Sequence, residues 1–275
     1  MTTLFVIFTA VNLMARSGEQ PPRLILVTQS ADYVHDVVKR EGGPSRVERT
    51  FDELARRSGL FTVDWTEDVT TLSPQRIRAA RIIVFYTTGN LPLTDEQFDA
   101  FEQWLKDGGA FLGIHCATDT LASHPRYPQI IGAKFDGHPW EAEATVTIKV
   151  HEPDWEACKP YAPGATFQEE IYHFKDFDPT QVRVLMSLDM SRTELKKPYH
   201  VPIAWCKSYG RGKVFYTELG HRDDVWASER YQAHLIGAIQ WLLGDDEHDP
   251  TPNPQVSQRE DEAARAVVAA TQPAR

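Results

Sequence analysis

The chain has 275 residues, of which 41% are hydrophobic and 25% charged, an ordinary globular composition with enough length for one sizeable core. Its formal net charge of −10 opposes binding to a phosphate backbone, so nucleic acid is not an expected partner. The three cysteines, Cys116, Cys158 and Cys206, are too widely spaced for a disulfide framework or a CxxC metal site.

Residues 1–22 predict a leader and linker ahead of the folded part. Residues 4–15 are almost wholly apolar, and the following Arg16-Ser17 resembles part of a secretory cleavage site. Twelve residues are too few to cross a bilayer as a helix, so no membrane span is expected. Two interpretations stay open. A genuine signal peptide predicts export to the periplasm or the extracellular space, and otherwise the protein is cytoplasmic and this segment is an extra strand.

Strand and helix signals alternate through the first half of the chain. Ser45 and Thr94 are the predicted N-caps of two helices, which end near Gly59 and Gly108. Nearly continuous apolar strands joined by helices indicate a parallel sheet that is covered on both faces. The predicted strands of this half are 23–28, 61–65, 81–87 and 110–114.

The second half predicts more strands and a closing helix. The motif SYGRG suits a hairpin turn, and residues 228–243 predict an amphipathic helix that ends at Gly244. Residues 247–275 lack aromatics and are rich in acids, which predicts a disordered tail with a transient helix over 260–270. The folded domain is therefore expected to span 23–246. The predicted strands are 142–150, 181–188, 202–206 and 213–219.

Histidines and glutamates stand at the ends of several apolar segments. His115 and His221 each follow a predicted strand directly. Ligands of open α/β sheets bind at the carboxyl ends of the strands, so both imidazoles are expected to face one cleft. Imidazole serves there as general base, proton shuttle or metal ligand, although a single such histidine is commonly a structural hydrogen-bonding group. The four stretches are GIHCATD (113–119), FDGHPW (135–140), EEIYHF (169–174) and LGHRDDVW (219–226).

Other chemistries are less well supported by the sequence. Cys116 adjoins a predicted strand end, but His115 occupies the apex of the turn and no GxCxG pattern exists, so a thiol nucleophile is not expected. No GxGxxG motif follows the first strand, which argues against a Rossmann cofactor. Two histidines and a carboxylate on separate loops can form a zinc or manganese site, although no HExxH motif is present.

Several of these motifs together resemble the trehalose-utilisation, or ThuA-like, family. The segments are GGAFLGIHCATD, FDGHP, EIY, PIAW followed by YGRGKV, and LGH followed by Trp226, over roughly residues 23–244. The resemblance implies an α/β fold of flavodoxin-like, class I glutamine amidotransferase-like type, a three-layer sandwich with a mostly parallel sheet. That superfamily carries a cysteine nucleophile at the strand-to-helix elbow, where this chain has His115, so amidotransferase chemistry is not expected.

The resemblance also implies a small carbohydrate ligand. The family is tied to disaccharide catabolism and to sugars oxidised to 3-keto forms. Glu170 or His115 is the expected base, and His221 and His138 are the expected polarising or ligating groups. Carried over by position, the implied site contains His115, Asp119, His138, Glu170, Tyr172 and His221, with Trp140 or Trp226 as ring platforms.

Two function classes remain open at this point. The first is an isomerase, lyase or hydrolase that performs acid/base chemistry on a glycoside or keto-sugar. The second is a non-catalytic sugar-binding module on a degenerate amidotransferase scaffold. A zinc or manganese ion is the only cofactor under consideration, and the sequence does not reveal the oligomeric state. The candidate metal ligands are His115, His138, Glu170 and His221.

Overall fold

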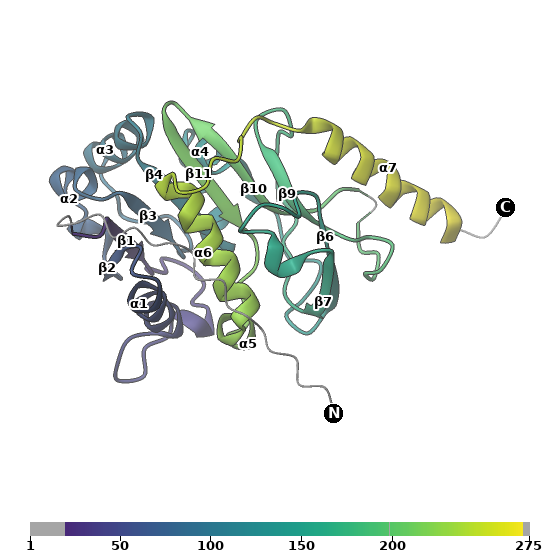
Figure 1. The fold of residues 1–275 in the computed structure, drawn as a ribbon, viewed down its shortest axis with the longest axis horizontal. Helices are drawn as coiled ribbons and strands as arrows, with labels where there is room; N and C mark the ends of the chain where they lie inside the picture. Colours follow the sequence, from purple (N-terminus) through teal and green to yellow (C-terminus); the bar gives the residue numbers. More distant parts are fainter. Residues whose placement is uncertain (1–19, 198, 272–275) are drawn as a thin grey trace, which may run out of the picture.

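The computed structural model describes residues 20–197 and 199–271 (Figure 1). Residues 1–19 of the predicted leader lie outside the described residues. The first strand begins at Arg23, where the sequence predicts the start of the folded domain.

A nine-stranded sheet forms the centre of the molecule. The strands lie in the order β2-β1-β3-β4-β11-β10-β9-β6-β7. The first five in this order pair in parallel, and only β10 and β6 run against the other strands of this sheet, so the prediction of a mostly parallel sheet is confirmed. The strands are β1 (Arg23–Val27), β2 (Thr62–Thr66), β3 (Ile82–Phe85), β4 (Ala110–Ile114), β6 (Thr145–Val150), β7 (Gly164–Gln168), β9 (Arg183–Leu188), β10 (Pro202–Tyr209) and β11 (Gly212–Thr217), with β5 (Lys134–Phe135) and β8 (Phe174–Lys175) forming a small separate sheet.

Helices cover both faces of the sheet and complete the three layers. On one face lie α1 (Arg46–Ser58), α5 (Asp223–Ala227) and α6 (Glu229–Leu243), which appear together in front of the sheet in Figure 1. The other face is covered by α2 (Pro74–Arg78), α3 (Asp95–Lys106) and α4 (Tyr127–Ile131). Short 3-10 helices are η1 (Asp36–Val38), η2 (Val69–Thr71), η3 (His115–Asp119) and η4 (Lys159–Tyr161). Among the residues described, no helix has both the length and the apolar character that crossing a membrane requires.

The two-sided burial explains why the strands form continuous apolar runs. Leu24 and Leu26 of β1 pack into the core under α1 and α6, whereas Ile25 and Val27 pack into the core under α2 and α3. Every residue of such a strand except its first is buried, so apolar side chains are needed on both sides. The parallel half of the sheet therefore has a strong sequence signal.

Helix starts follow the predicted capping. The Ser45 hydroxyl accepts a hydrogen bond from the Glu48 backbone N–H, and the Glu48 carboxylate accepts one from the Ser45 N–H. Thr94 and Gln97 form the same reciprocal arrangement at the start of α3. Each arrangement satisfies two backbone donors that a helix end leaves without partners.

The predicted disordered tail over 247–275 is wrong for its described part, which contains the helix α7 (Pro254–Thr271). Figure 1 shows α7 running beyond β9 and β6. Val256, Glu260 and Ala264 are buried at four-residue spacing, so this helix docks through a narrow stripe. Because one member of that stripe is a glutamate, the composition of the segment does not reveal that the helix docks.

Candidate functional site

The carboxyl ends of β4 and β11 form the centre of the candidate site. These strands pair in parallel, with Thr217 opposite Ile114, so the residues that follow them emerge at the same edge of the sheet. His115 follows Ile114 with a φ of +47°, a left-handed conformation that is uncommon for a residue with a side chain. This sharp corner between β4 and η3 turns the imidazole toward the segment that follows β11.

One nitrogen of the His115 ring forms a triangle with one atom of His221 and one atom of Glu170. His115 Nδ1 lies 2.7 Å from the backbone oxygen of Glu218, which can only accept, so Nδ1 carries the proton and Nε2 presents a lone pair. That Nε2 lies 3.3 Å from His221 Nδ1 and 3.4 Å from Glu170 Oε1. His221 Nδ1 in turn lies 3.2 Å from the same Glu170 oxygen. The structure thus brings together three of the residues named from the sequence.

His35 joins this cluster and was missed by the sequence analysis. Its ring centroid lies 5.1 Å from that of His115 and 5.2 Å from that of His221. Its Nδ1 is buried and has no hydrogen-bond partner among the described residues. One ligand atom from each of His35, His115, Glu170 and His221 falls within 4.8 Å of every other. His35 lies in the loop after β1, so a search for histidines beyond every parallel strand would have found it.

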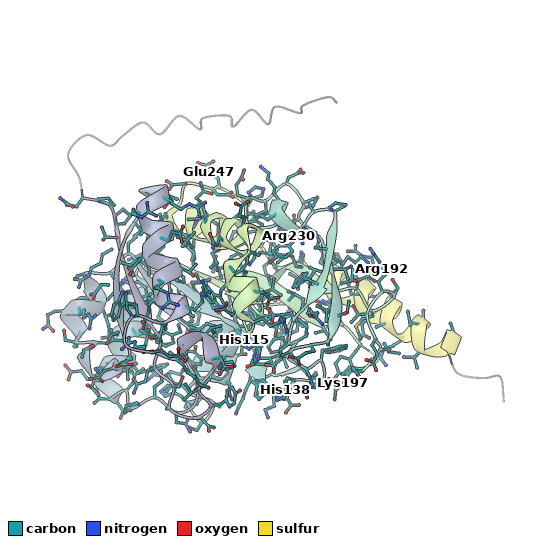
Figure 2. The ribbon with its side chains drawn as sticks, turned by 90° about the horizontal axis from the view of Figure 1, so that it is seen from below. His115, His138, Arg192, Lys197, Arg230 and Glu247 are labelled. Carbon is teal, nitrogen blue, oxygen red and sulfur yellow. The ribbon has the colours of Figure 1, made fainter. Side chains whose placement is uncertain are left out.

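His138 and Tyr172 complete the surroundings. His138 Nδ1 lies 3.6 Å from the second oxygen of Glu170 and 3.2 Å from a Glu141 oxygen. The His138 side chain is 43% exposed, whereas His115 is fully buried. Both residues are labelled in Figure 2. The Tyr172 ring centroid lies 4.3 Å from that of His115. We call His35, His115, His138, Glu170 and His221 the histidine–glutamate site, and His138 is its most exposed member.

Two fully buried glutamates, also missed, support the site from behind. Glu169 accepts hydrogen bonds from the backbone N–H groups of Glu170 and Gly220, and so ties together the two segments that meet at the site. Glu218 accepts one from the backbone N–H of Tyr172. Burial raises the pKa of Glu169 to about 7 and raises the pKa of Glu218 well above its ordinary value. Neither could be chosen from sequence, because a run such as Glu169-Glu170 does not reveal which carboxylate faces inward.

The charges in the site are set by burial and by contact with Glu170. Burial alone would raise the pKa of Glu170, but the contacts with His115 and His221 outweigh it and hold that pKa well below its ordinary value. Burial lowers the pKa of His115. Burial, followed by the neighbouring His115 and His221, lowers the pKa of His35 to about 2. For His221, burial is outweighed by Glu170 and the pKa is raised. At neutral pH the cluster thus contains an anionic carboxylate and at least two neutral imidazoles.

The two tryptophans named as ring platforms do not fit that role. Trp140 and Trp226 are fully buried. Their indole N–H groups donate to the backbone oxygens of Glu194 and Gly220, each at 2.7 Å. Neither offers an open ring face on which a sugar could stack, because both rings fill the core.

Asp119 and Cys116 lie beside the site without joining it. Asp119 is half-buried at the end of η3, and burial and then Asp32 raise its pKa. No contact among the described residues joins its carboxylate to Glu170 or to the histidines. Cys116 is buried and burial raises its thiol pKa well above the ordinary value, which is unfavourable for a thiolate nucleophile.

Comparison with known proteins gives a consistent family assignment. The ThuA model, described as trehalose utilisation, matches residues 25–242. A ThuA-like protein from Bacteroides uniformis ATCC 8492 has a TM-score of 0.65 at 20% identity, covering 86% of this chain and 97% of its own. One from Parabacteroides merdae ATCC 43184 has a TM-score of 0.63 at 13% identity, covering 85% and 94%. A β-galactosidase from Bacillus circulans sp. alkalophilus has a TM-score of 0.50 at 11% identity, over 82% of this chain and 31% of its own. At these identities the likeness shows the fold alone, and no curated protein matches the chain in sequence.

Proposed function

Since the chain belongs to the trehalose-utilisation (ThuA) family, we propose that it is an enzyme performing acid/base chemistry on a keto-sugar or glycoside derived from a disaccharide. The observation that carries the proposal is the contact of one buried, ionised glutamate, Glu170, with histidines from three separate segments, His115, His138 and His221. Imidazoles gathered around a carboxylate are suited to moving protons at neutral pH.

We assign the proton transfer to His138, rather than to the Glu170 or His115 expected from sequence. His115 is fully buried, and the lowered pKa of Glu170 makes it a weak base. The Nδ1 of His138 faces the carboxylates of Glu141 and Glu170, so Nδ1 carries the proton and Nε2 presents a lone pair to an incoming sugar. Its exposure allows a substrate to reach it.

The proposed step is the removal of a proton from the carbon next to a sugar ketone. His138 Nε2 accepts that proton, and the electron pair of the broken C–H bond moves onto the ketone oxygen to give an enediolate. Return of the proton to the former ketone carbon, with the hydroxyl proton of the enediolate passing to the former ketone oxygen, isomerises the sugar. Departure of a group on the next carbon, with proton transfer to it, eliminates that group instead. Both outcomes begin with the same exchange of a C–H proton.

The residues also fit a divalent metal ion. A tetrahedral zinc ion with ligands at about 2.0–2.1 Å holds them about 3.3 Å apart. The triangle formed by His115 Nε2, His221 Nδ1 and Glu170 Oε1 has sides of 3.2–3.4 Å, and one ring nitrogen of His35 lies in the same cluster. His115, His221 and Glu170 would hold zinc or manganese, with His35 beside the remaining position. Such an ion supplies Lewis-acid polarisation of a ketone oxygen.

The test is proton exchange measured by NMR in deuterated water, with 3-keto-trehalose as the substrate and elemental analysis of the same preparation. We expect the wild-type protein to exchange the C–H proton beside the ketone. His138→Gln should abolish the exchange, while His124→Gln, away from the site, should leave it unchanged. A wild-type protein that binds the sugar without exchange or turnover would instead be a carbohydrate-binding module.

A further inference from the structure

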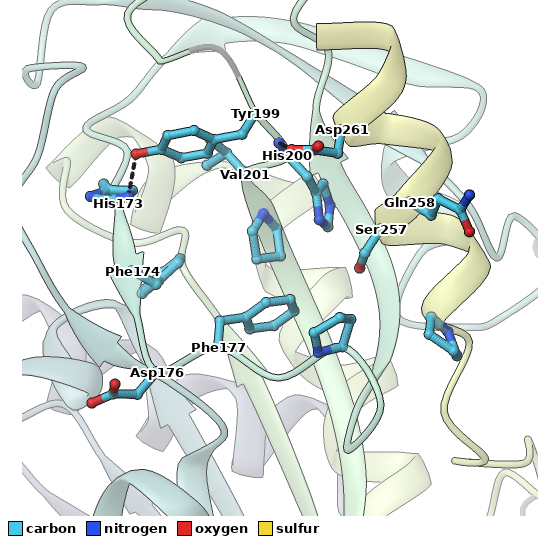
Figure 3. A pocket seen from close by; sticks show the side chains of 13 residues that line it. His173, Phe174, Asp176, Phe177, Tyr199, His200, Val201, Ser257, Gln258 and Asp261 are labelled. Carbon is cyan, nitrogen blue, oxygen red and sulfur yellow. Dashed lines mark hydrogen bonds between the residues drawn. The ribbon is translucent and has the colours of Figure 1, made fainter. Parts of the chain in front are cut away.

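A second hollow lies under the first turns of α7 and shares no residue with the histidine–glutamate site. It encloses about 580 Å³, within the range of small-molecule pockets. Its walls come from the segment around β8, the segment that leads into β10, and α7 itself (Figure 3). We call it the α7 pocket. Its lining residues are His173, Phe174, Asp176, Phe177, Pro179, Tyr199, His200, Val201, Pro202, Pro254, Ser257, Gln258 and Asp261.

Ser257 presents an unpaired hydroxyl to the α7 pocket. Its residue is only 7% exposed, and its Oγ has no hydrogen-bond partner among the described residues. Figure 3 shows this oxygen pointing from α7 into the hollow. A buried hydroxyl without a partner costs free energy, so the position suits a ligand that supplies a hydrogen bond.

A chain of hydrogen bonds fixes His200 as a donor to the same hollow. The Arg259 guanidinium only donates, so His151 Nδ1, 3.4 Å away, accepts and His151 Nε2 carries the proton. That Nε2 lies 2.8 Å from Ser187 Oγ, which lies 2.7 Å from His200 Nε2. The Ser187 hydroxyl therefore accepts from His151 and donates to His200. This leaves the proton of His200 on Nδ1, the ring nitrogen that makes no hydrogen bond among the described residues.

The remaining lining groups select against anions and favour a ring with apolar faces. Asp176 and Asp261 bring negative charge, and none of the described lining residues is a lysine or an arginine. A phosphate or carboxylate group would meet repulsion there without a compensating cation. Phe174, Phe177 and the three prolines supply flat apolar surface of the kind against which sugar rings pack.

We propose that the α7 pocket is an accessory binding site for a neutral sugar, separate from the histidine–glutamate site. Apolar walls with a few fixed polar groups, the Ser257 hydroxyl, the His200 N–H and the Asp261 carboxylate, match an uncharged ring that carries hydroxyl groups. The choice of a sugar over another neutral polyol rests on the proposed function, whereas the pocket itself does not depend on it.

Calorimetric titration with trehalose, glucose and glucose 6-phosphate tests this site. The titrations use Glu170→Gln protein, in which the histidine–glutamate site is disabled. Trehalose or glucose should bind, and glucose 6-phosphate should not. Ser257→Ala should weaken the binding about fivefold through loss of one hydrogen bond. Its Tm without sugar should not fall, because the hydroxyl has no partner to lose. Ser208→Ala, at an exposed position of β10, is the matched control and should bind as the parent does.

The contrary outcomes are equally distinct. The proposal would be overturned if neither neutral sugar bound, or if glucose 6-phosphate bound more tightly than the neutral sugars. It would also be overturned if Ser257→Ala and the pocket-filling Ser257→Leu both bound the sugar as tightly as the parent protein does. Binding by wild-type protein that is lost in Glu170→Gln would assign the sugar to the histidine–glutamate site and also overturn it. If the wild-type protein exchanges no keto-sugar proton but still binds trehalose in a way that depends on Ser257, the proposed enzyme activity is rejected and the accessory site is supported.

Discussion

The two halves of the sheet build their polar sites in different ways. In the parallel half, β4 and β11 end at the same edge, and a histidine of the histidine–glutamate site follows each strand, His115 immediately and His221 after a short segment. In the antiparallel half, the α7 pocket forms where a late helix covers the segment around β8 and the segment that leads into β10. Sites at parallel strand ends can therefore be traced along the chain, whereas sites between a helix and loops depend on docking that composition conceals.

Removing the charge at the centre of the parallel half should have the largest effect. Glu170→Gln keeps the shape but loses the anion that contacts three histidines, and we expect turnover to fall about 10³-fold. Glu141→Gln, which removes the exposed partner of His138, should cost far less. Steady-state rates on a keto-sugar measure both. Equal losses for the two variants would contradict a central role for Glu170.

Acid should weaken the antiparallel half through two buried histidines. Burial lowers the pKa values of His151 and His200 to about 4 each. Between pH 6.5 and 4 the unfolded chain binds protons that the folded chain does not, so the free energy of unfolding falls as the pH is lowered through this window. By linkage the loss should be on the order of 3 kcal/mol for each of the two imidazoles.

Urea denaturation at several pH values measures this loss. The double variant His151→Gln/His200→Gln cannot take up these protons and should show a flatter pH dependence than the wild-type protein. Identical slopes for the two proteins would contradict the buried, neutral state of these imidazoles.

Glu169 tests the support behind the parallel site. In Glu169→Gln an amide NH₂ must face one of the two backbone N–H donors that the carboxylate now accepts from, at Glu170 and Gly220. We expect the free energy of unfolding at pH 8 to fall by about 2 kcal/mol. Glu194→Gln changes the same group at an exposed ion pair and serves as the control. A stability equal to that of the control would show that Glu169 does not hold the two segments together.

The smallest expected effect concerns the attachment of the chain just before α7. Asn253 is buried and exchanges two hydrogen bonds with the backbone of Val184 in β9, at 2.7 and 3.0 Å. Asn253→Ala should lower the free energy of unfolding by about 1 kcal/mol and expose α7 to limited proteolysis. The exposed Asn90→Ala is the control. Unchanged proteolysis of α7 would mean that this anchor is not what holds the helix.

The sequence predicted those features whose physical cause is local. The cap residues Ser45 and Thr94 act on helix N–H groups three positions away, so their pattern is visible in the chain. His115 was found because it ends an apolar run. His35 was not, because a polar loop separates it from β1 and only the three-dimensional fold returns it to the cluster.

Burial of large side chains was harder to predict than position. Trp140 is close to His138 in sequence and was therefore proposed as a ring platform, yet its ring turns into the core. Composition does not distinguish a tryptophan that stacks on a ligand from one that packs in the core. The buried stripe of α7 was not predicted for a related reason. Its member Glu260 counts as a surface residue by type but is buried with a 2.8 Å ion pair to Lys149.

The left-handed backbone at His115 would present any side chain at the same point of the sheet edge, including a thiol. In His115→Cys, however, the sulfur would lie in the neighbourhood of the Glu170 anion, and that negative charge favours the protonated thiol. The backbone corner alone is thus insufficient to activate a thiol at this position, because the charge of the neighbouring carboxylate opposes the thiolate.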